Sequence, residues 1–207
     1  MDEFYREHHR QFQDRYDTRR LADAQTRLIY HDTVTEEDRA FIESRDMFFL
    51  STVDEQGWPT VSYKGGDVGF VKVVDPRTVA FPIYNGNGQW LSVGNAAATR
   101  KVGMLFIDFE NPHRLRLHGT ASVSDSDELL SAYHEAELIV RVHIENLFIN
   151  CSRYVHRMKK VEHSKFVPNP KCRTPLPDWK KIPEVRDLLP EKDRRRLEEE
   201  EAEEGRA

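Results

Sequence analysis

A short polar run between residues 62 and 66 has the composition of a binding site. Ser62, Tyr63 and Lys64 offer two hydroxyl groups and an ammonium group, and Gly65 and Gly66 follow directly. Two residues without side chains let a flat ring approach the backbone closely. The same three polar residues also suit the end of an ordinary surface strand. From the residues alone, both interpretations stay open.

A second run, Asn85-Gly86-Asn87-Gly88, precedes a segment from Gln89 to Thr99 with the small, alanine-rich composition of a short helix. Loops rich in glycine and asparagine are usually only turns. Where such a loop opens a helix, its backbone N–H groups and the positive end of the helix dipole can hold a phosphate. The run alone does not decide between a turn and an anion site.

Other familiar chemistries find little support. The nine histidines form no H-E-x-x-H or facial-triad spacing, so no metal site is expected. Cys151 and Cys172 are far apart and in no C-x-x-C arrangement, which predicts two free thiols in a reducing compartment. Cys151 has no paired base in sequence and is expected to be a buried structural thiol.

Composition limits the classes of protein. The chain has 207 residues and a net charge of -5, which suits one core with terminal additions and argues against a nucleic-acid surface. The first 20 residues are heavily charged, and no later run approaches the roughly 18 apolar residues that span a bilayer. We therefore expect a soluble, cytoplasmic protein without membrane or nucleic-acid partners.

The elements that must position these residues are mostly strands. Thr35, with Asp38 three residues on, predicts a helix N-cap and a short helix to about Ser44. Short β-branched and aromatic runs separated by tight turns then predict antiparallel strands, and a further helix is expected from Ser126 to about His134. The expected strands are 48–53, 58–64, 70–74, 78–83, 101–108, 114–123 and 137–148. Hairpin order favours a barrel or sandwich over a doubly wound sheet.

Three domain-level regions follow from this pattern. Residues 1–34 are expected to form a helical extension, 35–165 the barrel domain, and 166–207 a proline-rich wrap with a charged tail. For the tail, a frayed solvated helix or disorder is expected.

Three motifs in order resemble one family. They are Phe49-Leu50-Ser51-Thr52-Val53 with the Gly57 turn, Thr60-Val61-Ser62-Tyr63-Lys64-Gly65-Gly66, and Gly103-Met104-Leu105-Phe106-Ile107-Asp108 followed by Arg114-Leu115-Arg116-Leu117-His118-Gly119. Together they resemble the pyridoxamine 5′-phosphate oxidase-like, FMN-binding split-barrel family over roughly residues 35 to 160.

The resemblance implies a mainly β fold: an antiparallel, six-stranded split β-barrel of Greek-key type with flanking helices. It also implies a homodimer with FMN at the subunit interface and a small-molecule substrate. The cofactor-binding residues that it implies are Val61, Ser62, Tyr63, Lys64, Pro82, Ile83, Asn87, Gly88, Gln89, Ser92 and, from the partner subunit or as one of several candidate cations, Arg153. No catalytic residue is assigned.

The chain departs from the family pattern at two places. The arginine that opens the family's Arg-x-Val-Leu-Leu-Lys strand is Pro59, and the basic phosphate clamp falls at Asn87-Gly88-Gln89. Backbone N–H groups, Ser92 and a cation from elsewhere would have to replace the clamp. The favoured function is an FMN-dependent oxidoreductase acting on an unidentified small molecule. The alternative is a protein on the same barrel that binds flavin, deazaflavin or haem without turnover.

Overall fold

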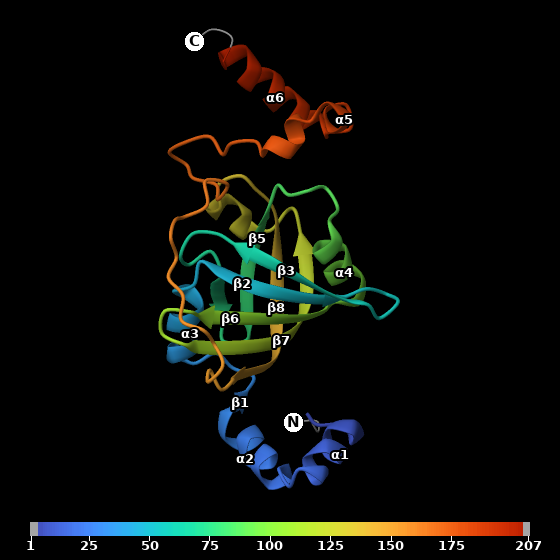
Figure 1. Cartoon of the computed structure of the whole chain (residues 1–207), viewed down its shortest axis with the longest axis vertical. Helices are drawn as coiled ribbons and strands as arrows, with labels where there is room; N and C mark the ends of the chain where they lie inside the picture. The colour runs from blue at the N-terminus through green and yellow to red at the C-terminus, as the bar shows by residue number, and fades with distance from the viewer. Residues whose placement is uncertain (1–3, 205–207) are drawn as a thin grey trace. The chain divides into compact units, whose positions relative to one another are not determined.

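The computed structural model describes residues 4–204, and the chain divides into two compact units between Lys160 and Val161. Figure 1 shows the elements of each unit. No helix in the described range is long and apolar enough to cross a membrane.

The N-terminal unit is built on one antiparallel sheet of eight strands. In spatial order the sheet runs β3-β2-β6-β7-β8-β5-β4, and β1 pairs with β8 outside this path. The strands are β1 (Tyr30–His31), β2 (Met47–Val53), β3 (Pro59–Gly65), β4 (Lys72–Asp75), β5 (Thr78–Tyr84), β6 (Lys101–Asp108), β7 (His113–Ser124) and β8 (Ala136–Ile149). The expected mainly β, antiparallel fold with flanking helices is confirmed. The sheet has eight strands instead of six and is not closed, and the two-residue β1 was not expected.

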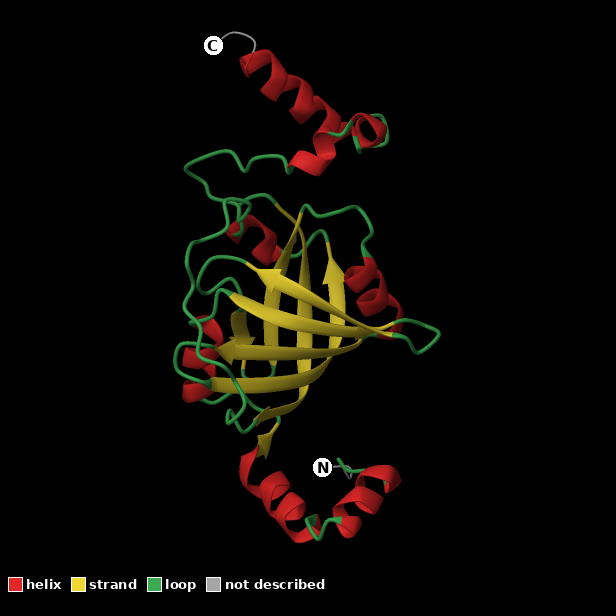
Figure 2. Ribbon diagram, viewed as in Figure 1, coloured by secondary structure: helices red, strands yellow, loops and turns green. Residues whose placement is uncertain are grey.

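The sheet is strongly curved (Figure 2), and apolar side chains of most of its strands form one buried core. Burial alternates along β2, where Phe48, Leu50 and Thr52 are buried and their neighbours are only half-buried. Phe48 packs against Phe70, Phe81 and other buried aromatic rings of the same core. In β2, therefore, the alternation shows which face lies inside.

Two helices flank the sheet. Helix α3 (Glu36–Glu43) begins at the capping box predicted from Thr35: the Thr35 hydroxyl accepts from the Asp38 N–H at 3.1 Å, and the Asp38 carboxylate accepts in return from the Thr35 N–H. Helix α4 (Leu91–Thr99) contacts β2, β3 and β7. The helix expected near Ser126 is instead a single 3₁₀ segment, η1 (Glu128–Ala132), whose N-cap is Asp127.

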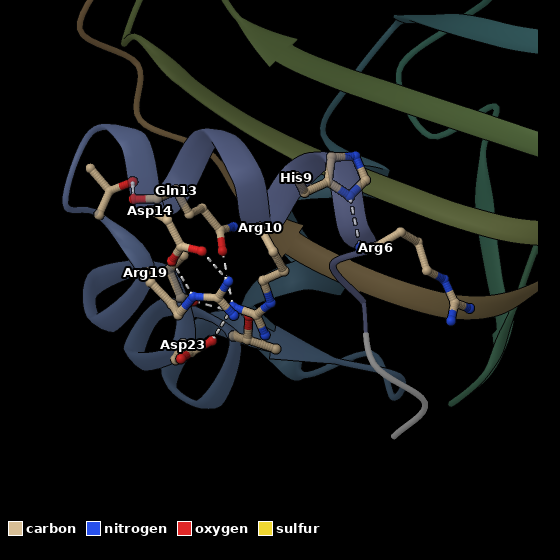
Figure 3. Close-up of polar contacts among 10 residues, drawn as sticks. Arg6, His9, Arg10, Gln13, Asp14, Arg19 and Asp23 are labelled. Atoms are coloured by element: carbon tan, nitrogen blue, oxygen red, sulfur yellow. Dashed lines mark hydrogen bonds and ion pairs between the residues drawn. The ribbon is translucent and has the colours of Figure 1, made fainter.

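The N-terminal extension forms two helices, α1 (Glu7–Arg15) and α2 (Arg19–Ile29). Ion pairs join them at Arg10 with Asp23, 2.6 Å, and at Arg19 with Asp14, 2.5 Å (Figure 3). Ahead of the helices, the Phe4 ring stacks on the His118 ring of β7, and α2 leads directly into β1 on β8. The extension is thereby tied to the sheet.

The C-terminal unit has its own small core of Leu176, Leu189 and Leu197. Its helices are η2 (Asp178–Lys181), α5 (Pro183–Arg186) and α6 (Glu191–Glu204). The ion pair between Lys180 and Asp193 is buried, with 2.8 Å between Nζ and Oδ2. The tail was expected to be a frayed solvated helix or disordered. It is a helix, but it is not wholly solvated, because its one leucine, Leu197, is buried in this core.

Candidate functional site

The structure brings together two residues of the expected cofactor set that lie 28 positions apart. Lys64 is the last residue but one of β3, and Ser92 lies in the first turn of α4. The Lys64 ammonium donates a hydrogen bond to the Ser92 hydroxyl at 2.8 Å. Ser92 is buried and Lys64 is half-buried. Strand β3 and helix α4 therefore meet at a cationic group.

The beginning of α4 is arranged to leave backbone donors available. Its N-cap residue, Trp90, makes no side-chain cap and has a positive φ of 53°, an uncommon conformation for a bulky residue. In the preceding loop the Asn87 side chain accepts from the Gln89 N–H at 3.1 Å, and Gly88 has a φ of 78°. Residues 85–90 are all exposed. An uncapped helix start beside an ammonium group has the chemistry to hold an anion.

Buried polar contacts hold α4 in place on β2. The Asn95 side chain donates to the Thr52 hydroxyl at 3.2 Å, and both residues are buried. One turn later the Thr99 hydroxyl donates to the Val53 carbonyl at 2.9 Å. These bonds fix the helix N-terminus relative to Lys64. Neither threonine was expected to hold α4 on β2, because a threonine in a sequence carries no signal of such a contact.

Strand alternation separates the residues expected along the flat ring. Ser62 and Lys64 are paired with Leu50 and Phe48, and cross-strand partners share a face, so both point to the inner side. Val61 and Tyr63 point to the outer side, where they are 66% and 63% exposed. No described strand pairs with the other side of β3. Residues 61–64 therefore do not share one face of β3; what they share is the free edge of the strand.

The remaining expected residues are distributed along the barrel. Pro82 and Ile83 are buried in β5 opposite Ile139 and Leu138 of β8, immediately before the Asn-Gly loop. Arg153 follows β8 and is exposed, and its guanidinium carbon lies 5.5 Å from the centroid of the Tyr154 ring. Within one chain no contact joins it to Lys64.

Two further expectations concern single side chains. Cys151 was expected to be buried and is exposed, because it lies just after β8 ends, and the Arg114 guanidinium donates to its carbonyl oxygen instead of covering its thiol. The thiols of Cys151 and Cys172 are both free, as predicted. Trp58 and Trp90 are 70% and 46% exposed, so neither belongs to the core.

The charge on Lys64 has no counter-ion in the described part of the chain. Burial lowers the pKa of its ammonium group below the usual lysine value, and no carboxylate pairs with it. An ammonium group that is partly removed from water and left without an opposite charge destabilises the folded state. A bound anion would remove this cost.

We expect Lys64→Met to stabilise the ligand-free protein by about 1 kcal/mol at pH 7, because a buried charge is exchanged for an apolar side chain of similar length. The folded pKa lies below the unfolded one, so the folded state binds fewer protons and wild-type stability rises as pH increases toward the ordinary value of 10.5. The gain in Lys64→Met should therefore shrink at pH 10. Urea unfolding at both pH values measures it, and a gain that is equal at both would contradict the explanation.

The antiparallel sheet with flanking helices matches the architecture of a β-rich split barrel, and the candidate residues Lys64 and Ser92 meet between β3 and α4. The model of the pyridoxamine 5′-phosphate oxidase family matches residues 34–150, which is more than half of the chain. The chain belongs to this family. A comparison with curated proteins finds no match.

Solved structures resemble the chain more distantly. HupZ of Group A Streptococcus is 20% identical, and the match covers 61% of this chain and 99% of HupZ with a TM-score of 0.47. A putative pyridoxamine 5′-phosphate oxidase from Lactobacillus delbrueckii is 23% identical, over 57% of this chain and 95% of its own, with a TM-score of 0.45. An FMN-binding protein from Syntrophomonas wolfei is 13% identical, over 68% and 97%, with a TM-score of 0.44. All three TM-scores lie below 0.5, so these structures carry no argument about the chain. Its assignment to the family rests on the match over residues 34–150.

Proposed function

We propose that the protein binds FMN, with the phosphate at the N-terminus of α4. The observation that carries this proposal is the contact of 2.8 Å between the Lys64 ammonium and the Ser92 hydroxyl, beside an uncapped helix start. A phosphate needs charge-assisted donors as well as backbone N–H groups. Lys64 supplies the cation that the loop at Asn87, Gly88 and Gln89 lacks.

The rest of the chain supports a flavin along β3. The free edge of this strand offers backbone donors and acceptors to the polar edge of a ring. FMN, when bound, supplies the electron transfer, while the protein positions it and tunes it by hydrogen bonds. We infer an oxidoreductase acting on a small molecule. A homodimer that brings Arg153 of a second copy to the phosphate completes the proposal.

The first test is the visible absorption spectrum of the purified protein, before and after addition of FMN and removal of the unbound excess. We expect a flavin band near one equivalent per chain, and at least tenfold weaker binding of riboflavin, which has the same ring without the phosphate. Equal binding of both flavins would remove the phosphate from the explanation. A protein that takes up neither flavin would overturn the proposal.

One observation favours the alternative of a binding protein without turnover. The only polar side chain that contacts Lys64 in the described residues is the Ser92 hydroxyl, so no acid or base stands beside it to move a proton. Anaerobic addition of NADPH or NADH to the FMN-loaded protein separates the two functions. Bleaching of the flavin band supports the oxidoreductase, and a band that persists supports the binding protein.

A further inference from the structure

A cavity of about 510 Å³ lies on the outer face of the sheet, on the other side of β3 from Lys64. Its floor is formed by Met47 of β2, Tyr63 of β3 and Ile107 of β6. These three side chains face outward because their strand neighbours, among them Phe48 and Phe106, are fully buried in the core. The volume falls within the range of sites for small organic molecules, roughly 300 to 1,000 Å³.

Ion pairs form the polar walls and cancel one another. Arg45 pairs with Asp108 at 3.1 Å, and Lys160 pairs with Asp46 at 2.5 Å. The two other charged residues of the lining, one lysine and one glutamate, bring the total to three cations and three anions. A ligand with a net charge would lose water here without meeting an excess of opposite charge. The electrostatics therefore favour an uncharged ligand with hydrogen-bonding groups.

The apolar part of the lining suits a flat aromatic ring. Tyr63 and Phe109 contribute aromatic side chains, and Met47 and Met158 contribute flexible thioethers that adapt to a ring and contact it favourably through sulfur. Burial raises the pKa of the Tyr63 hydroxyl, and the Asp46 carboxylate adds to the rise against the opposing effect of Lys160. The hydroxyl thus keeps its proton at neutral pH and can donate it to a ring nitrogen or carbonyl.

The segment that follows β8 forms one side of the cavity with residues 158–160, and we call this segment the strap. The Met158 N–H donates to the Phe109 carbonyl at 3.0 Å, and the Arg157 guanidinium donates to the Glu110 carbonyl at 3.2 Å. The third tie is the Lys160 pair with Asp46, in which the lysine side chain is 53% exposed. These three interactions are few, and the ion pair reaches the surface, so the strap can open to admit a ligand.

We propose that this cavity is a second binding site, for an uncharged planar heteroaromatic molecule, separate from the anion site at α4. The Tyr63 side chain and the Lys64 side chain lie on opposite faces of one strand, so one ligand cannot place the same ring on both. The second site is argued independently of FMN binding, because neither Ser92 nor any residue of the Asn-Gly loop is part of its lining.

The test is a fluorescence titration of the full chain with 7-amino-4-methylcoumarin, an uncharged planar probe, and with its 3-acetic acid derivative, which carries a negative charge. We expect saturable binding of one neutral probe per chain, at least tenfold tighter than the charged one. Tyr63→Ala and Met158→Ala should each weaken it at least fivefold. Val61→Ala is the matched control, since Val61 is exposed on the same face of β3 and does not line the cavity.

Excess FMN should leave probe binding unchanged. Displacement of the probe by FMN would show that the cavity belongs to the flavin site and would overturn the separate site, while leaving FMN binding itself intact. Binding that is not saturable, that favours the charged probe, or that survives both cavity substitutions in folded protein would also overturn it. Tyr63 and Met158 are both exposed, so neither substitution removes packing from the core, and circular dichroism checks the fold of each variant.

Discussion

Lys64→Met should weaken FMN binding about 30-fold at pH 7 and leave riboflavin binding almost unchanged. The substitution removes the cationic donor beside Ser92 and keeps a side chain of similar length. A hydrogen bond to a charged group contributes about 2 kcal/mol, and each 1.4 kcal/mol changes affinity tenfold. The dissociation constants of both flavins, measured by fluorescence quenching for wild type and variant, give the effect as a ratio.

Tyr63→Phe is the matched control for this result. It alters the adjacent residue of the same strand, whose side chain points to the opposite face, and removes only a hydroxyl. FMN affinity should change less than threefold. If Tyr63→Phe lowers FMN affinity as much as Lys64→Met does, the phosphate does not lie at Lys64 and the assignment to the α4 N-terminus is wrong.

Gly119→Ala should lower the free energy of unfolding by about 3 kcal/mol. Gly119 is buried in β7 at a β-bulge, where the register with β8 shifts between His118 and Gly119. A Cβ atom there would meet Val142 Cγ1 at 2.5 Å and the His143 carbonyl oxygen even closer. The backbone of β8 would have to move, and overpacking of this kind costs about 1 to 3 kcal/mol or more.

Gly103→Ala tests whether the effect comes from the clash and not from glycine in a strand. Gly103 lies one rung away in β6, opposite His118, and a Cβ atom there would meet Ser51 and His118 side chains only at 3.7 and 3.8 Å. The free energy of unfolding of Gly103→Ala should therefore differ from wild type by less than about 0.5 kcal/mol. Urea unfolding of the two variants measures both values, and a similar loss in both would refute the steric explanation.

The strands could be predicted from the sequence because the residues of each strand and turn by themselves indicate which side chains are buried and where the chain reverses. The alternation around Phe48 and Leu50 and the turn glycines set the strand limits, and Thr35 and Asp38 set the start of α3. The tail was harder to predict. One leucine among many charges does not show that Leu197 belongs to a core with Leu176 and Leu189, since those partners come from irregular, proline-rich chain.

The candidate site was predictable only in part. The resemblance placed Lys64 and Ser92 in one cofactor set, and the structure shows that they touch. Their contact depends on how α4 lies on β2, which the buried Asn95 and Thr52 decide across 43 positions of sequence. The cavity was missed for a similar reason. Asp46 and Lys160 are ordinary charged residues until the fold places them 2.5 Å apart.

The free edge of β3 is open both to another protein molecule and to a ligand, so the tendency to aggregate at a given protein concentration should depend on ligand occupancy. Unpaired N–H and C=O groups along an edge strand can template pairing with a strand of another molecule, and Thr60, Val61, Ser62 and Tyr63 carry no charge to prevent it. Pro59 and Lys64 protect only the two ends. A molecule lying along this edge would occupy the same backbone groups, so the loaded protein should resist aggregation better than the empty one. Colloidal stability thereby becomes an indirect report of whether the strand is covered.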